Sequence, residues 1–127
     1  MPKKVMILED DADLRDVLED VVSTAGHEVL YSGSDADVLE RVKAAVPDLV
    51  FLDLRLGGAM RGEDVYAALR ADARTKDVPV VICTVHREQS VSRKLGDKKQ
   101  PDDKNLHALY KPFHVEQALQ LLKGILG

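Results

Sequence analysis

The stretch VPDLVFLDLRLGG (residues 46–58) holds the pattern around which the rest of the chain is arranged. Four consecutive apolar residues at positions 49–52 are followed at once by the acidic side chain of Asp53. A continuous apolar run of this length is typical of a strand buried on both faces of a sheet. The stretch therefore predicts a buried strand with a carboxylate directly at its carboxyl end.

Comparable short apolar runs occur elsewhere along the chain, at residues 5–8, 28–32, 80–83 and 108–110. Between the runs, apolar residues recur at helical spacing, at residues 14–25, 38–46, 65–69 and 115–126. Strands that alternate with helices imply a parallel sheet covered on both faces. We therefore predict one α/β domain over residues 1–127, with a flavodoxin-like, doubly wound, five-stranded parallel sheet in the order 2-1-3-4-5 and helices on both faces.

Local signals mark where several of these helices begin and end. Asp11 or Asp13 is placed to cap the amino end of the first helix, and Gly26 stands where its carboxyl-terminal cap belongs. Ser34 is the expected N-cap of the second helix, and Pro47 marks the end of that helix. These signals predict short connections between the elements.

The composition excludes several classes of protein. The net charge of −4 gives no general reason to bind nucleic acid, and no apolar run approaches the roughly 20 residues that cross a membrane. Cys83 is the single cysteine, so no internal disulfide can form, and we expect a cytoplasmic protein. The sequence has no phosphate-binding G-x-x-x-x-G-K-[ST] loop, and its four histidines lack the spacing of a zinc site.

Polar side chains follow four of the predicted strands at the point where each strand ends. Glu9 and Asp10 follow the first strand, Asp53 the third, Thr84 the fourth and Lys111 the fifth. The carboxyl ends of parallel strands meet at one edge of the sheet, where open α/β sheets bind their ligands. An isolated residue of any of these types is more often a helix cap, a turn residue or a surface group, but the ordered set predicts a site.

Carboxylates that converge on one edge repel one another and need cations for neutralisation. Lys111 supplies one positive charge, and a hard divalent ion bound through oxygen atoms would supply the rest. Mg²⁺ suits a site of one or two carboxylates with waters and a phosphoryl oxygen, and Mn²⁺ is a substitute. The set therefore indicates phosphoryl transfer to a carboxylate nucleophile, which depends mainly on positioning and charge neutralisation.

The strings ILEDDADLR, PDLVFLDLRL, VPVVICT and YKPF together resemble the receiver domains of two-component response regulators, over essentially the whole chain. The resemblance implies that Asp53 accepts a phosphoryl group from a phosphohistidine of a sensor histidine kinase or a histidine phosphotransfer protein. It implies that the protein is not a conventional enzyme, but catalyses its own phosphorylation and slow dephosphorylation. It also implies that phosphorylation changes the affinity for a downstream protein partner.

The same resemblance assigns roles to the individual residues. Asp10 and Asp53 would bind the metal directly, Glu9 would act through a metal-bound water, and the metal would also bind the backbone carbonyl of Arg55. Thr84 and Lys111 would hold phosphoryl oxygens, and the peptide bond between Lys111 and Pro112 would be cis.

The loop after the phosphoacceptor departs from the family pattern. Gly57 stands where these domains usually carry proline, and Gly62 comes one residue later than the matching glycine. Val85 follows Thr84 at a position where a small residue is usual. We expect a longer and freer loop and narrower access to the phosphoryl site.

The switch region departs as well. Ala108 occupies the position of the usual aromatic residue, and we expect Tyr110 and His107 to point elsewhere by strand alternation. Autodephosphorylation should be slow because Arg55 and His86 occupy the positions that normally help to place the attacking water. Output should pass through a rearranged segment over residues 85–107.

Two other readings stay open. A pseudo-receiver would bind a protein partner without taking phosphate, whereas an aspartyl-phosphate hydrolase of the haloacid-dehalogenase type should carry a D-x-D string after its first strand, which is absent here. The sequence ends directly after the last predicted helix, so we expect either a stand-alone receiver or one excised from a larger regulator. We expect no direct contact with nucleic acid or membrane, and a monomer or weak homodimer.

Overall fold

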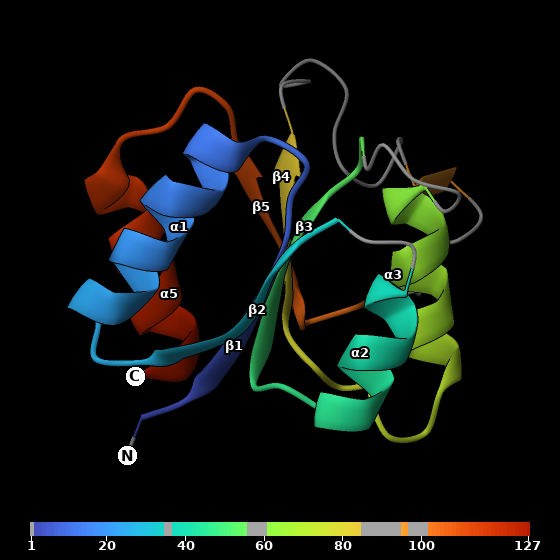
Figure 1. Ribbon diagram of the computed structural model, residues 1–127. Coiled ribbons are helices and arrows are strands. Elements are labelled where there is room, and N and C mark those ends of the chain that lie inside the picture. Colours follow the sequence, from blue (N-terminus) through green and yellow to red (C-terminus); the bar gives the residue numbers. More distant parts are fainter. Residues whose placement is uncertain (1, 35–36, 56–60, 85–94, 97–101) are drawn as a thin grey trace.

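The computed structural model describes residues 2–34, 37–55, 61–84, 95–96 and 102–127. Within these residues, the strands form one parallel sheet in the order β2-β1-β3-β4-β5, which confirms the predicted topology (Figure 1). The elements are β1 (Lys4–Leu8), α1 (Ala12–Thr24), β2 (Glu28–Gly33), α2 (Val38–Ala45), β3 (Leu49–Asp53), α3 (Gly62–Ala71), β4 (Val80–Thr84), β5 (Leu106–Tyr110) and α5 (Val115–Leu126).

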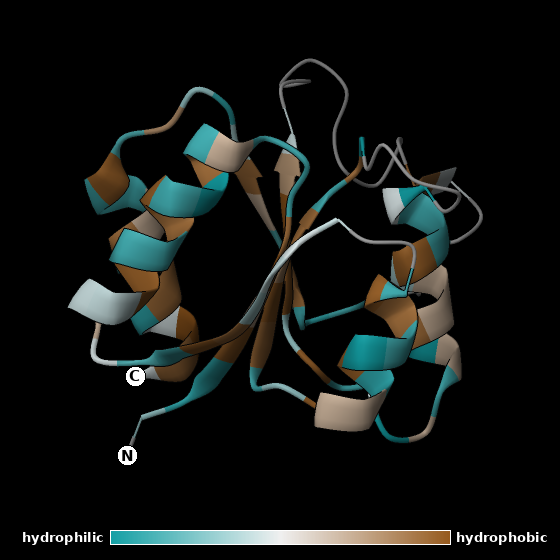
Figure 2. Cartoon of the chain, viewed as in Figure 1, coloured by the Kyte–Doolittle hydropathy of each residue, from teal (hydrophilic) through white to brown (hydrophobic). Residues whose placement is uncertain are grey.

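The two faces of the sheet carry separate hydrophobic clusters. Helices α1 and α5 cover one face, and α2 and α3 cover the other (Figure 1). Side chains alternate between the clusters along each central strand, so that Ile7 and Phe51 pack toward α1 and α5 whereas Leu8 and Leu52 pack toward α2 and α3. Figure 2 shows the apolar residues concentrated on the strands and on the helix sides that face them. The central strands are therefore buried on both faces, as their continuous apolar runs predict.

Strand β2 at the edge of the sheet contains an irregularity that the sequence pattern did not predict. Val5 pairs with Val29, but Met6 pairs with Tyr31, so Leu30 is an extra residue in the ladder and is 37% exposed. Because of this shift, Val29 and Tyr31 contribute to opposite faces of the sheet.

The helix ends confirm three predictions and correct one. Asp11 caps α1 by accepting hydrogen bonds from two backbone N–H groups, and Gly26 follows the helix with a φ of 85°. Helix α2 ends before Pro47, as expected. Its N-cap is Asp37, however, and not Ser34. Strand β2 continues to residue 33, which leaves Ser34 too far ahead of the helix to cap it.

Strand β5 also differs from the prediction. It begins at Leu106, two residues earlier than expected, and the Thr84–Tyr110 pair ends its ladder with β4. Tyr110 packs in the same cluster as Ala108, so the expectation that it points elsewhere is wrong. Residues two apart on a strand share a face. The other expected departures, at Gly57, Val85 and His86 and over most of residues 85–107, lie outside the described residues.

A buried ion pair fixes the amino end of β5 to α3. The side chains of Arg70 and Asp103 are 3% and 6% exposed, and their closest nitrogen and oxygen atoms are 2.7 Å apart. Tyr66 donates a further hydrogen bond of 2.7 Å to Asp103, and Arg70 also donates to the carbonyl oxygens of Val78 and Asn105. The network satisfies polar groups that would otherwise be buried without partners.

Gly62 allows the amino end of α3 to lie directly against the end of β3. Its N–H lies 3.3 Å from the carbonyl oxygen of Leu54. A Cβ atom at position 62 would overlap the carbonyl oxygen of Asp53 and the Cα of Leu54. Glycine is therefore required for this close approach, although it comes one residue late in the family pattern.

We predict that Gly62→Ala lowers the free energy of unfolding by about 1–3 kcal/mol, because the added methyl group must displace backbone atoms. Urea denaturation would measure the change. Gly124→Ala is the matched control, since nothing lies within 4 Å of the added Cβ in α5. The control should gain about 0.5–1 kcal/mol through helix propensity. A Gly62→Ala protein as stable as the wild type would contradict the close packing.

Candidate functional site

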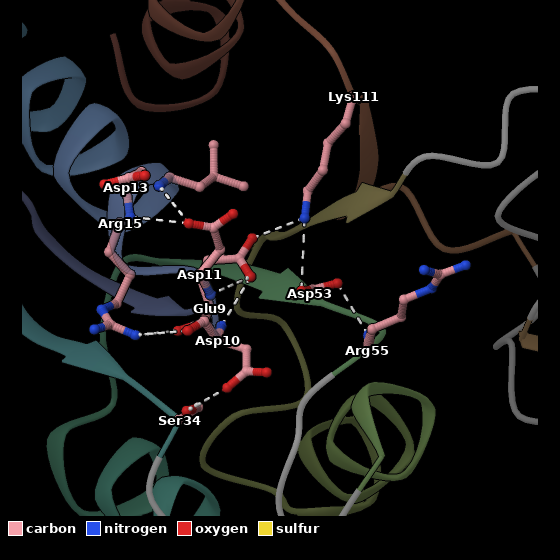
Figure 3. Close-up of polar contacts among 10 residues, drawn as sticks. Glu9, Asp10, Asp11, Asp13, Arg15, Ser34, Asp53, Arg55 and Lys111 are labelled. Carbon is pink, nitrogen blue, oxygen red and sulfur yellow. Dashed lines mark hydrogen bonds and ion pairs between the residues drawn. The ribbon is translucent and has the colours of Figure 1, made fainter.

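The carboxylates of Glu9 and Asp53 share one ammonium group, that of Lys111 (Figure 3). The Lys111 Nζ atom lies 2.8 Å from Glu9 Oε1 and 3.6 Å from Asp53 Oδ2. Glu9 directly follows β1, Asp53 ends β3 and Lys111 directly follows β5. Three residues from three strands thus meet at the carboxyl edge of the sheet, as the sequence predicts.

Two carboxyl groups of this site, those of Glu9 and Asp53, are withdrawn from solvent. Glu9 is 2% exposed, Asp53 is 7% exposed, and Thr84 at the end of β4 is also buried. The backbone N–H of Lys111 donates a 2.7 Å hydrogen bond to the carbonyl oxygen of Thr84, which aligns the ends of β4 and β5. The peptide bond between Lys111 and Pro112 is cis, as expected.

The loop between β1 and α1 is held by a dense set of hydrogen bonds. Glu9 Oε2 accepts from the backbone N–H groups of Asp10 and Asp11, at 2.8 Å and 3.3 Å. Arg15 on α1 donates from one guanidinium nitrogen to the carbonyl oxygens of both Glu9 and Asp10, at 3.0 Å and 3.1 Å. The loop therefore has a fixed backbone, with the Arg15 guanidinium bound to its carbonyl oxygens.

Asp10 and Arg55, the other two predicted metal ligands, lie at the same edge of the sheet. Asp53 Oδ1 accepts a 2.9 Å hydrogen bond from the backbone N–H of Arg55, which fixes the orientation of the carboxyl group. The Arg55 guanidinium extends away from Glu9 and Asp10 in Figure 3. The exposed Asp10 is directed toward the end of β2, where its Oδ1 accepts a 3.2 Å hydrogen bond from Ser34.

The electrostatics of the site are unbalanced in the absence of a further cation. Burial, followed by contact with the Asp53 carboxyl group, raises the pKa of Glu9 to about 7, although Lys111 acts in the opposite direction. Burial disfavours the charged form of Lys111, but its hydrogen bond to Glu9 and the charge of Asp53 raise its pKa overall. The ammonium of Lys111 thus does not offset the cost of burying the Glu9 carboxylate beside Asp53.

The donor set fits a hard divalent cation. The carboxyl groups of Glu9, Asp10 and Asp53 all offer oxygen atoms, and Glu9 and Asp53 share the ammonium of Lys111. Among the residues that the structure describes, no preformed cluster of three metal-ligating side chains is present. Mg²⁺ does not require such a cluster, because it commonly binds one or two carboxylates and keeps several waters.

Three polar contacts of the structure were not predicted from the sequence. Arg15 is the single base among the acidic residues 9–20, which is a signal for its role beside their backbone. Arg70 lies next to the apolar stripe of α3, so its burial could have been suspected from the helical pattern. The bond between Ser34 and Asp10 had no sequence signal, since it depends on the register of two strands.

Comparisons with known proteins agree with this geometry. Residues 5–123 match the family described as the response regulator receiver domain. The DNA-binding response regulator MtrA of Mycobacterium tuberculosis (strain ATCC 25618 / H37Rv) is 32% identical over 124 residues. That alignment covers 98% of this chain but 50% of MtrA, so the chain spans about half the length of this relative.

Solved structures share the fold at lower identity. The chemotaxis response regulator CheY4 of Vibrio cholerae has a TM-score of 0.80 and 22% identity, over 99% of this chain and all of that one. The receiver domain of the sensor histidine kinase PA1611 from Pseudomonas aeruginosa PAO1, solved with a magnesium ion in its active site cleft, also has a TM-score of 0.80. It is 18% identical, with 98% of each chain covered.

We predict that, without divalent cations, ionisation of Glu9 lowers the free energy of unfolding as the pH rises from about 4.5 to about 7. The folded protein holds this proton more tightly than the unfolded chain does, so losing it in this window disfavours the fold. Below the window both states are protonated, and above it the full cost is present. Urea unfolding in EDTA at about pH 5 and pH 8 would measure the difference.

Glu9→Gln should remove this dependence and be more stable than the wild type at the higher pH. Glu28→Gln, at an exposed position at the start of β2, is the control and should keep the wild-type dependence. If the free energy of unfolding of the wild type and of Glu9→Gln had the same pH dependence, the Glu9 carboxyl group would not be its source.

Proposed function

Because the chain belongs to the response regulator receiver family, we propose that it accepts a phosphoryl group on Asp53 in a Mg²⁺-dependent reaction and signals by a changed affinity for a protein partner. The donor is the phosphohistidine of a sensor histidine kinase or a histidine phosphotransfer protein. The proposed receiver domain spans residues 1–127. The pseudo-receiver is the competing function, but the complete set of acidic residues and Lys111 favours phosphorylation.

One observation carries this proposal: Glu9 and Asp53 are buried at the carboxyl edge of the sheet and share the ammonium of Lys111. Two buried carboxylates beside one cation are costly for the fold unless the site serves a ligand. A divalent ion and a phosphoryl group provide what the site lacks, since the ion balances the carboxylates and Lys111 faces the phosphoryl oxygens.

The chain's own residues would bind the metal ion in two ways, directly and through a water. Asp10, Asp53 and the backbone carbonyl of Arg55 would hold Mg²⁺, with Glu9 acting through a metal-bound water. When bound, the ion neutralises charge on the carboxylates and on the phosphoryl group. The magnesium in the PA1611 receiver domain supports this assignment, and Mn²⁺ is the expected substitute.

The transfer is an in-line displacement at phosphorus. A carboxylate oxygen of Asp53 forms the new O–P bond while the P–N bond to the donor histidine breaks, and the imidazole nitrogen leaves with the bonding electron pair and takes up a proton. Lys111 and Thr84 hold the phosphoryl oxygens during the exchange. The hydrogen bond from the Arg55 backbone fixes the attacking carboxyl group in advance, which lowers the cost of orientation.

The partners are proteins. A largely apolar groove of about 280 Å³ is lined by Lys111 together with Leu14, Val17 and Phe113, among others, and offers a surface at this edge of the sheet. No helix of the described residues is long and apolar enough to cross a membrane. We infer a cytoplasmic monomer or weak homodimer without direct nucleic-acid or membrane contact; the DNA-binding function named for MtrA belongs to a protein twice as long.

We predict that incubation with acetyl phosphate and Mg²⁺ adds one phosphoryl group to the intact protein, as measured by mass spectrometry. Asp53→Asn should abolish the gain, because it removes the nucleophile. Asp48→Asn is the matched control: this aspartate lies at an exposed position just before β3, and the variant should be phosphorylated like the wild type. Chelation of Mg²⁺ by EDTA should also prevent the gain. An unmodified wild-type protein would establish the pseudo-receiver instead.

We also predict that phospho-Asp53 is long-lived, since Arg55 stands where family members usually carry a side chain that helps to place the attacking water. The same mass measurement, repeated after the donor is removed, gives the lifetime. Arg55→Asn should shorten it, because a small amide can orient a water that the long guanidinium cannot. A wild-type lifetime of only seconds would contradict this interpretation.

A further inference from the structure

The Asp10 carboxylate is held by a residue that no part of the proposed mechanism yet uses. Ser34 Oγ donates a 3.2 Å hydrogen bond to Asp10 Oδ1 across a gap of 24 residues in the sequence (Figure 3). Asp10 is exposed and Ser34 is half-buried, so this carboxylate lacks the packing that fixes Glu9 and Asp53. The Ser34 hydroxyl is therefore the described side chain that restrains the Asp10 carboxylate.

The sheet register places Ser34 at this point. Leu8 pairs with Gly33, and the backbone N–H of Glu9 donates a 3.0 Å hydrogen bond to the carbonyl oxygen of Gly33. The ladder between β1 and β2 thus extends past the end of β1, and the next residue of each segment emerges at the same edge. Ser34 lies beside Asp10 because of this register and has no part in capping α2.

The rest of the loop is already fixed by other groups. Arg15 holds the carbonyl oxygens of Glu9 and Asp10, and Glu9 accepts from the backbone N–H of Asp10. These bonds determine where the Asp10 backbone lies but leave its side-chain rotation open. The hydroxyl of Ser34 completes the arrangement by selecting one orientation of the carboxylate.

We propose that Ser34 is a positioning residue that orients the Asp10 carboxylate for Mg²⁺. This inference rests on the proposed function and adds to it a residue that touches neither the ion nor the phosphoryl group. A hydroxyl that donates to one carboxylate oxygen leaves the other oxygen for a cation and reduces the rotational freedom lost on binding. Outer-shell hydrogen bonds of this kind commonly set the affinity of a metal site.

The test is the dissociation constant of Mg²⁺, measured by isothermal titration calorimetry on the intact, unphosphorylated protein. Ser34→Ala should weaken binding by about three- to tenfold, at or below the lower end of the usual effect of outer-shell partners, because the hydroxyl is neutral and partly exposed. Ser34→Thr keeps the hydroxyl and should restore wild-type affinity. The melting temperature of Ser34→Ala without Mg²⁺ should match that of the wild type, which a purely structural role would not allow.

Ser32→Ala is the matched control, because Ser32 lies on the same strand and donates a bond of the same length, 3.2 Å, to Glu19 instead. This variant should bind Mg²⁺ like the wild type. In an Asp10→Asn background, Ser34→Ala should cause no further loss, since the carboxylate on which it acts is gone.

The outcomes separate the two proposals. If the wild type binds Mg²⁺ and Ser34→Ala binds it equally well, the positioning role is wrong and the proposed function stands. If Ser34→Ala weakens binding equally in the Asp10→Asn background, Ser34 acts elsewhere and the inference is also wrong. If the wild type neither binds Mg²⁺ nor takes phosphate, the proposed function fails and this inference fails with it.

Discussion

Burial of the Glu9 and Asp53 carboxylates beside the single ammonium of Lys111 is the constraint on which the carboxyl edge of the sheet depends. Lys111 is 102 residues away from Glu9 in the sequence, so their contact ties the first strand to the last. The attraction is incomplete, because burial and the neighbouring Asp53 leave Glu9 with a pKa near 7. The carboxyl edge of the sheet therefore has too little positive charge to balance its buried carboxyl groups. This shortage disfavours the ionised form of Glu9 in the fold at neutral pH, and a bound cation would relieve it.

Much of this arrangement could be predicted from the sequence, because it follows from rules that act within short segments. Buried parallel strands have continuous apolar runs, and residues 49–52 form such a run directly before Asp53. Once strands and helices alternate, the carboxyl ends of the strands must share one edge. The order of the sheet and the convergence of Glu9, Asp53 and Lys111 follow from these two steps, and the structure confirms them.

The features that could not be predicted depend on register between distant segments. Ser34 has the chemistry of a helix cap, and its bond to Asp10 appears only when the extension of the β1–β2 ladder is known. The extra residue Leu30 shifts that ladder and has no distinct sequence signal. The error over Tyr110 was different in kind, since alternation along β5 already places it on the face of Ala108. The buried pair of Arg70 and Asp103 joins segments 33 residues apart, and charged residues are normally expected at the surface.

These polar contacts explain how an edge strand can hold a charged side chain in place. Strand β5 is only partly buried, so apolar packing alone would hold it loosely. Asp103, close before its amino end, is bound to Arg70 of α3, and Lys111 at its carboxyl end is bound to Glu9. Helix α3 begins at Gly62, in contact with the backbone of Asp53, so the same helix contacts the end of β3 and anchors β5. The separation of the Lys111 ammonium from the Asp53 carboxylate is therefore governed by α3 as well as by the sheet. A change in the position of α3 would therefore reach the backbone of Asp53 directly and β5 through Asp103.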